Sequence, residues 1–537
     1  MQRSVWLACK LSSPAVLIVL IWGVLLALVA VGPIDYPGQP STAVLVIVGI
    51  GLASFLLAYR GGGFLFDVGF ARRPEMPALS AAMLNRVVAG TSLVGIAGIA
   101  LMALDRTVLS GVNNASYSEL LRCAPGLISF IEIKRTPILY LGYVTFSFGF
   151  VSLILFLLKG EVIKGWAAAL AQLSVISPVG YAVLYSGRFP ILLAMLLMLS
   201  TMLIRVSQGH RLLPAGHHLL LKVMIALGLF VLYSSWVWSS RQNFCIQLTP
   251  LISELEGKQR QANPLVATQT PEPPTQQAPS SPAAPPTARA PAQPPTGPQA
   301  APATTPPAPV EGISGTDLSK KMADAAAVPS AASSQTNTAA SVLAIMLEAW
   351  NVKPRGYVAS ALDAGYLSPQ AALIGLSSFF YLTHGVRTID IGWQARDRFS
   401  PQRGIYEVGV LSPILRVFFP QVQQVSIMEA ELKSTGIYGF FPTAWLAAFI
   451  DFGMIGAIVY ILLWGAVAGW SATGARRSDL LTPQLLLIFV ISSILLSPVQ
   501  GPLGIANAAL VLGSLLIVGL IVDGWPRFAK RADPVAA

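Results

Sequence analysis

FFPTAWLAAFIDFGMIGAIVYILLWG, residues 440–465, is apolar and long enough to cross a bilayer as a helix, yet it carries one acid, Asp451. A carboxylate in hydrocarbon is costly unless it is paired or hydrogen-bonded. Asp451 follows the start of the run near Pro442 by about nine residues, which places it roughly 13 Å deep at about 1.5 Å per residue. We therefore expect Asp451 to face a polar cavity open to the outer side and to meet an arginine there. The sequence leaves open whether it is a catalytic base or orients that arginine, and the orienting role is favoured.

The whole chain has the composition of an integral membrane protein. Of its 537 residues, 54% are hydrophobic and only 11% are charged, and the mean hydropathy is +0.65. A soluble domain carries about 25% charged residues. The net charge of +11 comes from Lys and Arg scattered through the loops, so we expect no nucleic-acid partner. The opening MQRSVWLACK leads into an apolar run without a cleavage site, which indicates a first spanning helix.

Ten apolar runs predict an all-α, polytopic helical bundle of about ten spanning helices, with re-entrant or interfacial helices on the outer side. Lys and Arg gather in alternate loops, so the positive-inside rule places both termini in the cytoplasm and the large loop outside. The runs are residues 14–31, 42–59, 87–104, 138–158, 166–185, 190–204, 219–238, 442–470, 485–497 and 503–522.

These runs predict four regions. Residues 1–238 form an N-terminal membrane bundle of about seven helices, and residues 442–537 form a C-terminal group of about three. Residues 239–367 form an extracytoplasmic loop, in which the Pro- and Ala-rich stretch at about 259–341 predicts a disordered tether. Residues 368–441 form an extracytoplasmic re-entrant or interfacial segment.

Within the last of these segments, Ser368–Gly385 is nearly long enough to span. If it crossed, the arginine-rich stretch after it would move inside and Arg476 and Arg477 would move outside, against the positive-inside rule. We therefore interpret it as re-entrant or interfacial. A true eleventh spanning helix is the alternative.

Arginines are the candidate ligand-binding residues, because a guanidinium suits phosphate oxygens in two-pronged geometry. Arg188 occupies a tight outer turn, SGRFP, where the alternative is an arginine snorkelling to the interface. Tyr406 offers a hydroxyl and a stacking face for sugar rings. Asp390, Asp397 and Glu407 are candidate acids, although they could simply pair with the arginines. The other candidate arginines are Arg387, Arg396, Arg398, Arg403 and Arg416.

Soluble-enzyme motifs are absent from the sequence. It contains no P-loop, no dinucleotide fingerprint, no H-E-x-x-H and no Cys/His cluster. Three of the four histidines fall in one basic loop, GHRLLPAGHHLLLK, which suits a membrane surface better than a metal site. We therefore expect no cofactor and no metal.

Two stretches resemble the bacterial oligosaccharide repeat-unit polymerases, the Wzy-type O-antigen and exopolysaccharide polymerases. They are FFYLTHGVRTIDIGWQ…RGIYEVGVLSPILRVF and STGIYGFFPTAWLAAFIDFGMIGAIVYILLWGAVAGW. YSGRFPIL resembles the family's S-G-x-R turn, with Arg188 in place of its arginine. The resemblance covers the C-terminal third well and the rest mainly as hydropathy, and the Pro-rich insertion departs from the family pattern. The matching positions are Tyr381, Gly404, Tyr406, Thr435, Tyr438, Asp451, Phe452, Gly453 and Gly456.

The resemblance implies a glycosyltransferase on the extracytoplasmic face of the bacterial inner membrane. It would move a growing glycan from polyprenyl diphosphate to the next lipid-linked unit, without metal or nucleotide, beside a chain-length regulator and a repeat-unit flippase. Arginines would stabilise the leaving diphosphate, and an acid would act as base. The alternatives are a transporter or flippase of lipid-linked glycans and a related glycan ligase. The implied catalytic residues are Asp451, Arg188, Arg403 and Glu407, and the implied diphosphate- and sugar-binding residues are Arg387, Arg396, Arg398, Arg416, Tyr381 and Tyr406.

Overall fold

The computed structural model describes most of the membrane-embedded chain. The described residues are 10, 12–70, 80–109, 136–185, 187–214, 224, 228–229, 232–233, 335–409, 428, 431–432, 442–504 and 508–532. The chain forms two compact units, and the first of them contains all the described helices: Met1–Asn114, Arg135–Ser235 and Ser330–Ala537. The second unit, Ala115–Lys134 and Trp236–Pro329, lies outside the described residues, as does the predicted Pro-rich tether.

Seven helical segments are long and apolar enough to cross a membrane. Two further apolar helices, α20 and α21, have shorter apolar parts, and the predicted run at 219–238 falls mostly outside the described residues. The structure therefore confirms a helical, multi-pass membrane protein, whereas the count of ten spans stays a prediction. The seven are α2 (Pro14–Val31), α3 (Thr42–Phe70), α4 (Ala81–Leu104) with the π-helical turn η1 (Asp105–Leu109), α6 (Pro137–Phe146) with α7 (Phe148–Lys159), α8 (Gly165–Leu173) with α9 (Ile176–Leu184), α10 (Phe189–Ser207) and α19 (Ala444–Arg477).

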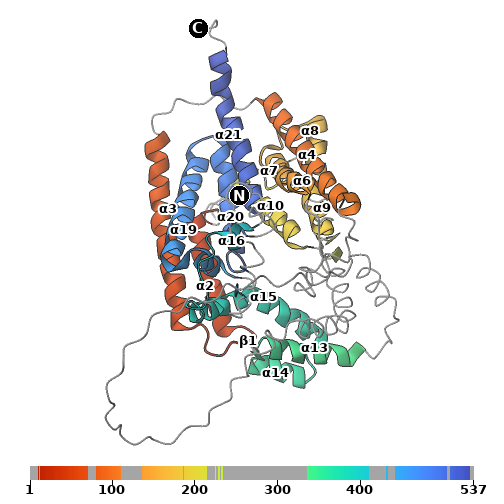
Figure 1. Ribbon diagram of the computed structural model, residues 1–537, viewed down its shortest axis with the longest axis vertical. Helices are drawn as coiled ribbons and strands as arrows, with labels where there is room; N and C mark the ends of the chain where they lie inside the picture. Colours follow the sequence, from red (N-terminus) through yellow and green to blue (C-terminus); the bar gives the residue numbers. More distant parts are fainter. Residues whose placement is uncertain are drawn as a thin grey trace, which may run out of the picture. The chain divides into compact units, whose positions relative to one another are not determined.

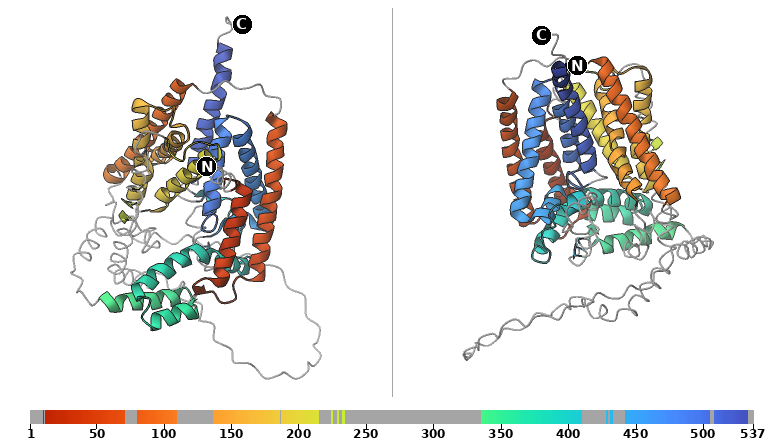
Figure 2. Two further views of the ribbon diagram at one scale, coloured as in Figure 1. Left: turned by 180° about the vertical axis from the view of Figure 1, so that it is seen from behind. Right: turned by 45° about the horizontal axis from the view of Figure 1, so that its top comes forward.

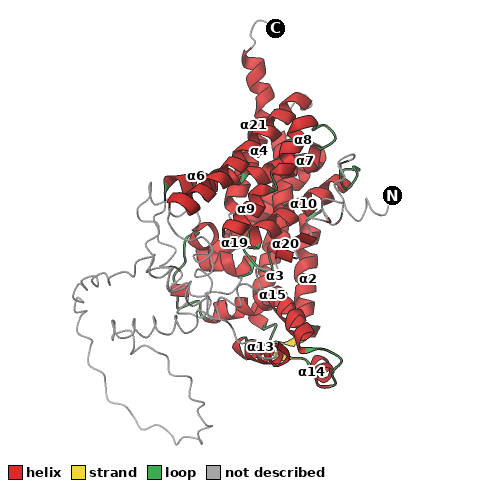
Figure 3. Ribbon diagram, turned by 90° about the vertical axis from the view of Figure 1, so that its right-hand side faces the viewer, coloured by secondary structure: helices red, strands yellow, loops and turns green. Residues whose placement is uncertain are grey.

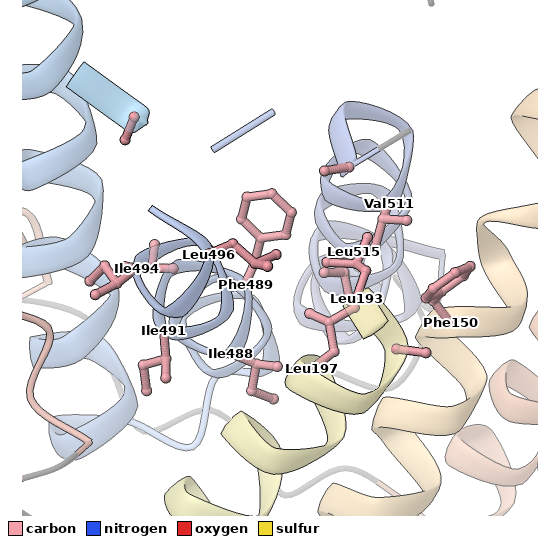
Figure 4. Close-up of a cluster of buried hydrophobic side chains, with 14 of the residues drawn as sticks. Phe150, Leu193, Leu197, Ile488, Phe489, Ile491, Ile494, Leu496, Val511 and Leu515 are labelled. Atoms are coloured by element: carbon pink, nitrogen blue, oxygen red, sulfur yellow. The ribbon is translucent and has the colours of Figure 1, made fainter. Parts of the chain in front are cut away.

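The helix α20 (Leu481–Leu496) lies at the centre of the bundle and is buried almost all round, as an evenly hydrophobic helix should be. Figure 4 shows its Ile488 beside Leu197 of α10, with Leu515 of α21 (Ala508–Ala532) and Phe150 of α7 nearby. These apolar contacts join the N-terminal and C-terminal membrane helices into one core, although the sequence places them in separate regions.

α3 and α19 pack side by side (Figure 1). A Cβ added to Gly62 would lie 1.9 Å from the carbonyl oxygen of Ala466, and one added to Gly469 would lie 1.8 Å from that of Tyr59. The two backbones therefore touch, which is how small residues hold membrane helices together.

The last turns of α3 and α19 lie at one end of the bundle, the end at which α21 finishes in Figure 1. There Arg477 forms an ion pair with Asp67 at 2.6 Å, which joins the last turns of α19 and α3. Arg205 is fully buried and donates to the carbonyl oxygens of Leu157 and Leu158 at 2.8 and 2.9 Å. These arginines therefore hold helix ends together.

Helices α13 (Gln335–Ala349), α14 (Gly356–Asp363) and α15 (Pro369–Gln394) gather at the opposite end (Figures 1 and 3). A two-residue strand, β1 (Ile34–Asp35), pairs antiparallel with β2 (Lys353–Pro354) and ties this outer layer to the loop after α2.

α15 is one continuous helix that crosses the spanning helices at a steep angle, as Figure 2 also shows. Ser368, its N-cap, accepts a hydrogen bond from the N–H of Ala371, which is a usual start for a helix. The stretch that we expected to be re-entrant or interfacial forms its first part. Its position relative to a membrane stays a prediction.

Candidate functional site

The site begins at a break in α19. Gly453 has φ 65° and ψ −172° inside an otherwise helical segment, a conformation that essentially only glycine adopts. Next to the break, the carbonyl oxygen of Ile450 accepts the N–H of Gln402 at 3.0 Å, and that of Asp451 accepts the N–H of Arg403 at 2.7 Å. The break therefore anchors the segment around residues 402 and 403 to α19.

Asp451 uses its side chain to hold the same segment. Its carboxylate is fully buried and accepts the N–H groups of Tyr406 and Glu407, both at 2.8 Å. These amides open the single helical turn α16 (Ile405–Val408), where unpaired N–H groups favour an anion. Asp451 is therefore the cap of α16.

This arrangement corrects the expectation that Asp451 meets an arginine across an open polar cavity. Within the described chain, no arginine side chain contacts the carboxylate, and Asp451 is 0% exposed. Two backbone amides satisfy the buried charge without the cost of desolvating a second ion. The backbone carbonyl of Asp451 accepts the Arg403 N–H, and the orienting role of Asp451 stays a prediction.

Arg403 stands on a tight turn above the break. It has φ 55°, and the next residue, Gly404, has φ 90°, so two successive residues adopt left-handed conformations. Arg403 is exposed, and its guanidinium makes no hydrogen bond or ion pair with the described residues. The turn thus presents a permanently charged donor group beside the helix break.

Glu407 lies on the other side of α16 and is 3% exposed. Its Oε2 accepts the N–H of Leu503 at 2.9 Å, in the turn between α20 and α21, and its Oε1 has no hydrogen-bond partner among the described residues. A Cβ added to Gly501 would fall 1.7 Å from Oε1, so the turn packs directly on the carboxyl. Burial raises the pKa of Glu407 to about 8, the Leu503 N–H opposes this rise and the Asp451 charge adds to it. Near neutral pH, Glu407 is therefore mostly protonated.

The raised pKa of Glu407 predicts how stability depends on pH. In the unfolded chain the carboxyl titrates at its ordinary 4.5, whereas in the folded protein it titrates at about 8. Between these values only the folded state keeps the proton, so the free energy of unfolding falls as pH rises, by at most about 1.4 kcal/mol per unit. Melting temperatures in detergent from about pH 5 to about 9 should show this decline, and Glu407→Gln should flatten it. An equal slope in Glu407→Gln would assign the decline to another group.

Gln402 and Glu431 complete the anchor, and the sequence analysis missed both. Glu431 accepts the N–H and hydroxyl of Ser400 at 2.7 and 2.9 Å and the side-chain amide of Gln402 at 3.0 Å. Gln402 is itself 1% exposed. No motif marks these residues, because their contact joins positions about thirty residues apart.

The structure places Arg387 and Tyr381 away from the break. Arg387 is half-buried and donates to the carbonyl oxygens of Trp350 and Asn351 at the end of α13. Basic side chains often bind the last carbonyl groups of a helix in this way. The Tyr381 ring meets the edge of the Trp350 ring, with centroids 6.3 Å apart. Both residues therefore join α15 to α13.

Arg396 and Arg398 are exposed on the segment that leads from α15 to the break. The Arg396 guanidinium lies 4.8 Å from the centre of the Trp393 ring and 3.6 Å from Asp397. Asp397 is 82% exposed, so this ion pair adds little stability. The Arg398 side chain has no polar partner among the described residues, and Arg416 lies outside them.

Asp390 does not pair with an arginine among the described residues. It accepts hydrogen bonds from Gln39 at 2.9 Å, Ser41 at 2.8 Å and Gln394 at 2.9 Å. It therefore connects α15 to the loop before α3, in place of the arginine pairing that the sequence analysis gave as the alternative to a role as candidate acid.

Arg188 and a second arginine lie on other helices. Arg188 precedes α10 and lies near Tyr233, whose hydroxyl donates to the carbonyl of Ala182 at 2.9 Å; it is not a partner of Asp451 or Glu407. The sequence analysis missed Arg106, which is 5% exposed and donates to the Tyr185 hydroxyl at 3.2 and 3.3 Å. The sequence could have identified Arg106, because the charged pair in LDRTVL ends an apolar run.

Of the candidate catalytic and binding residues named from sequence, the structure thus brings four together at the break: Arg403, Tyr406, Glu407 and Asp451. The two acids are buried and hold backbone, and the arginine is exposed. Within the described residues, no group of three or more His, Cys, Asp or Glu could hold a metal ion. The arrangement presents an exposed guanidinium, a group that suits phosphate oxygens. Comparison with known proteins finds no matching family model, curated protein or solved structure.

Proposed function

We propose that the chain polymerises lipid-linked oligosaccharide repeat units on the extracytoplasmic face of a bacterial inner membrane. The bond from the anomeric carbon of the growing glycan to polyprenyl diphosphate breaks. A new bond forms from that carbon to a hydroxyl oxygen of the next lipid-linked unit, the hydroxyl proton passes to water, and the diphosphate leaves as an anion with the electron pair of the broken bond. The observation that best supports this proposal is an exposed arginine, Arg403, on a turn anchored to a break in a spanning helix.

Arg403 acts on the leaving group. Charge builds on the diphosphate as its bond to the sugar breaks, and a guanidinium fixed in advance stabilises that charge without having to reorganise. The double anchoring of the turn, by the backbone carbonyl and the side chain of Asp451, supplies this fixed position. Arg396 and Arg398, exposed on the same segment, add positive charge for the incoming diphosphate.

Asp451 and Glu407 are positioning residues in this proposal. They are 0% and 3% exposed, so neither reaches the hydroxyl of a large oligosaccharide. Asp451 caps α16, and Glu407 attaches α16 to the turn between α20 and α21. Together they determine where Arg403 stands.

A glycan gel from cells carrying Arg403→Ala tests the function. We expect loss of long polymer and accumulation of single repeat units on the lipid carrier outside, with the transfer rate about 100-fold lower, as for the removal of one fixed donor. Arg477→Ala is the matched control, because Arg477 is exposed at the other end of the bundle. Both variants are compared at equal membrane levels.

Two outcomes would contradict the proposal. Units trapped on the cytoplasmic face would favour a flippase. Normal polymer in Arg403→Ala would show that Arg403 has no role in the transfer.

A further inference from the structure

An apolar hollow lies beside the helix break. α3, α15 and α19 line it, and it is partly open to the surface. Phe449 and Met454 contribute to the wall from either side of Gly453, and Ala457 lies one turn further along α19. The walls are almost wholly apolar. Ile50 of α3 lines the hollow and is 37% exposed, so the hollow reaches the surface of the protein.

A cation lies against this apolar wall. Trp393 lines the hollow, and the guanidinium of Arg396 lies 4.8 Å from the centre of its ring. Arg396 also donates to the carbonyl oxygen of Trp393 at 3.0 Å. Its side chain nevertheless stays 43% exposed, so guanidinium N–H groups remain that can donate hydrogen bonds to a ligand. Arg398, two residues on, is exposed and without a polar partner among the described residues.

This combination suits an anionic lipid. The apolar hollow can receive an acyl or prenyl chain, and the arginines a few residues away can bind a phosphate group. Ordinary phospholipids offer two chains and a single phosphate, whereas a polyprenyl diphosphate offers one branched chain and two phosphates. A single hollow beside two arginines matches the second description better.

We infer that the hollow receives the first isoprene units of a polyprenyl carrier and that Arg396 and Arg398 hold its diphosphate. The inference rests on the proposed function for the choice of carrier, and it adds the location of the chain. Because the hollow touches both halves of α19, a bound chain would also contact the residues on either side of the break.

The test uses the full chain in nanodiscs and a farnesyl diphosphate with a photoreactive diazirine on its terminal isoprene. We expect cross-links to peptides of α19 around Phe449–Ala457 and of α15 around Trp393. Ala457→Trp fills the hollow and should lower labelling at least about tenfold. Ile455→Trp is the matched control, because Ile455 is 81% exposed on the same helix and should leave labelling unchanged. Ala457→Leu adds a smaller side chain and should lower labelling partly. It replaces the Trp variant in the test if that variant fails to fold.

The head group is tested separately. Arg396→Gln should weaken binding of the probe about tenfold, since charge-assisted contacts to phosphate are the strong ones, whereas Arg476→Gln at the other end of the bundle should not. Unlabelled farnesyl diphosphate should compete, and farnesol and phosphatidylglycerol should compete poorly. Equal competition by farnesol would remove the diphosphate from the inference, and equal competition by phosphatidylglycerol would make the hollow an ordinary lipid site. Either result overturns it.

Failure of this inference differs from failure of the proposed function. Cross-links that map elsewhere, with long polymer still lost in Arg403→Ala, would reject the hollow and keep the polymerase. Cross-links that map to the hollow, with repeat units trapped on the cytoplasmic face in Arg403→Ala, would keep the carrier site and reject the polymerase.

Discussion

Asp451→Asn should abolish long-chain glycan even though the substitution keeps the size of the side chain. The asparagine oxygen can still accept one of the two N–H groups of α16, but its amide nitrogen faces the other donor. One buried amide is then unsatisfied, which costs about 1–3 kcal/mol. The turn that carries Arg403 loses part of its anchor. Hydrogen exchange of the amides of residues 402–408 should rise together with the loss of polymer.

A second acid in the chain provides the matched control for this variant. Asp523 accepts the N–H groups of Leu481 and Thr482 at 2.9 and 2.8 Å, at the start of α20. It caps a helix as Asp451 does, but at the opposite end of the bundle. Asp523→Asn should lower the melting temperature by a similar amount and leave polymer length unchanged. Equal loss of polymer in both variants would mean that Asp451 acts only through stability.

Gly453→Ala should also remove most long polymer, by a different route. A Cβ at this position would lie 3.6 Å from Pro401 and meets nothing closer, so crowding is not the cause. The cost is conformational, because φ 65° with ψ −172° is unfavourable for alanine by roughly 1–3 kcal/mol. The variant therefore favours a continuous α19, in which the carbonyl oxygens of residues 450 and 451 bond within the helix and release residues 402 and 403.

Gly23→Ala is the control for the glycine variant. Gly23 lies within α2, and a Cβ there meets nothing within 4 Å, so the change should be neutral or slightly stabilising, as in an ordinary helix. Amide exchange at residues 402–408 and a glycan gel should distinguish the two variants. Normal polymer in Gly453→Ala would show that the break is dispensable.

Most of the helices could be predicted because a chain in lipid must satisfy its backbone within each segment, so long apolar runs become helices. The run at residues 14–31 became α2 with the same bounds. The interruptions could not be predicted. α6 and α7 part at Ser147, a small polar residue that membrane helices also carry without interruption.

The hydrogen-bond donors to Asp451 could not be predicted from the sequence, for a physical reason. Side-chain types suggest ion pairs, but every residue except proline carries a backbone amide, so no pattern singles out Tyr406 and Glu407 as donors. The arginines likewise read as one cluster. In the structure, Arg387 donates to a carbonyl oxygen at the end of α13, whereas Arg403 lies at the break. The two are separated because α15 continues past Arg387 and leads the chain away from it.

The break in α19 also has a mechanical consequence. An unbroken helix is a stiff rod that carries a push or a twist from one face of the membrane to the other. In this chain the half before the break is held by the Ala444 N–H on the carbonyl of Ser497, at 2.8 Å, and the half after the break by the ion pair of Arg477 with Asp67. Gly453 interrupts α19 between these two attachments, while α3 packs along both halves, so a change in the angle of α19 would be concentrated at that residue.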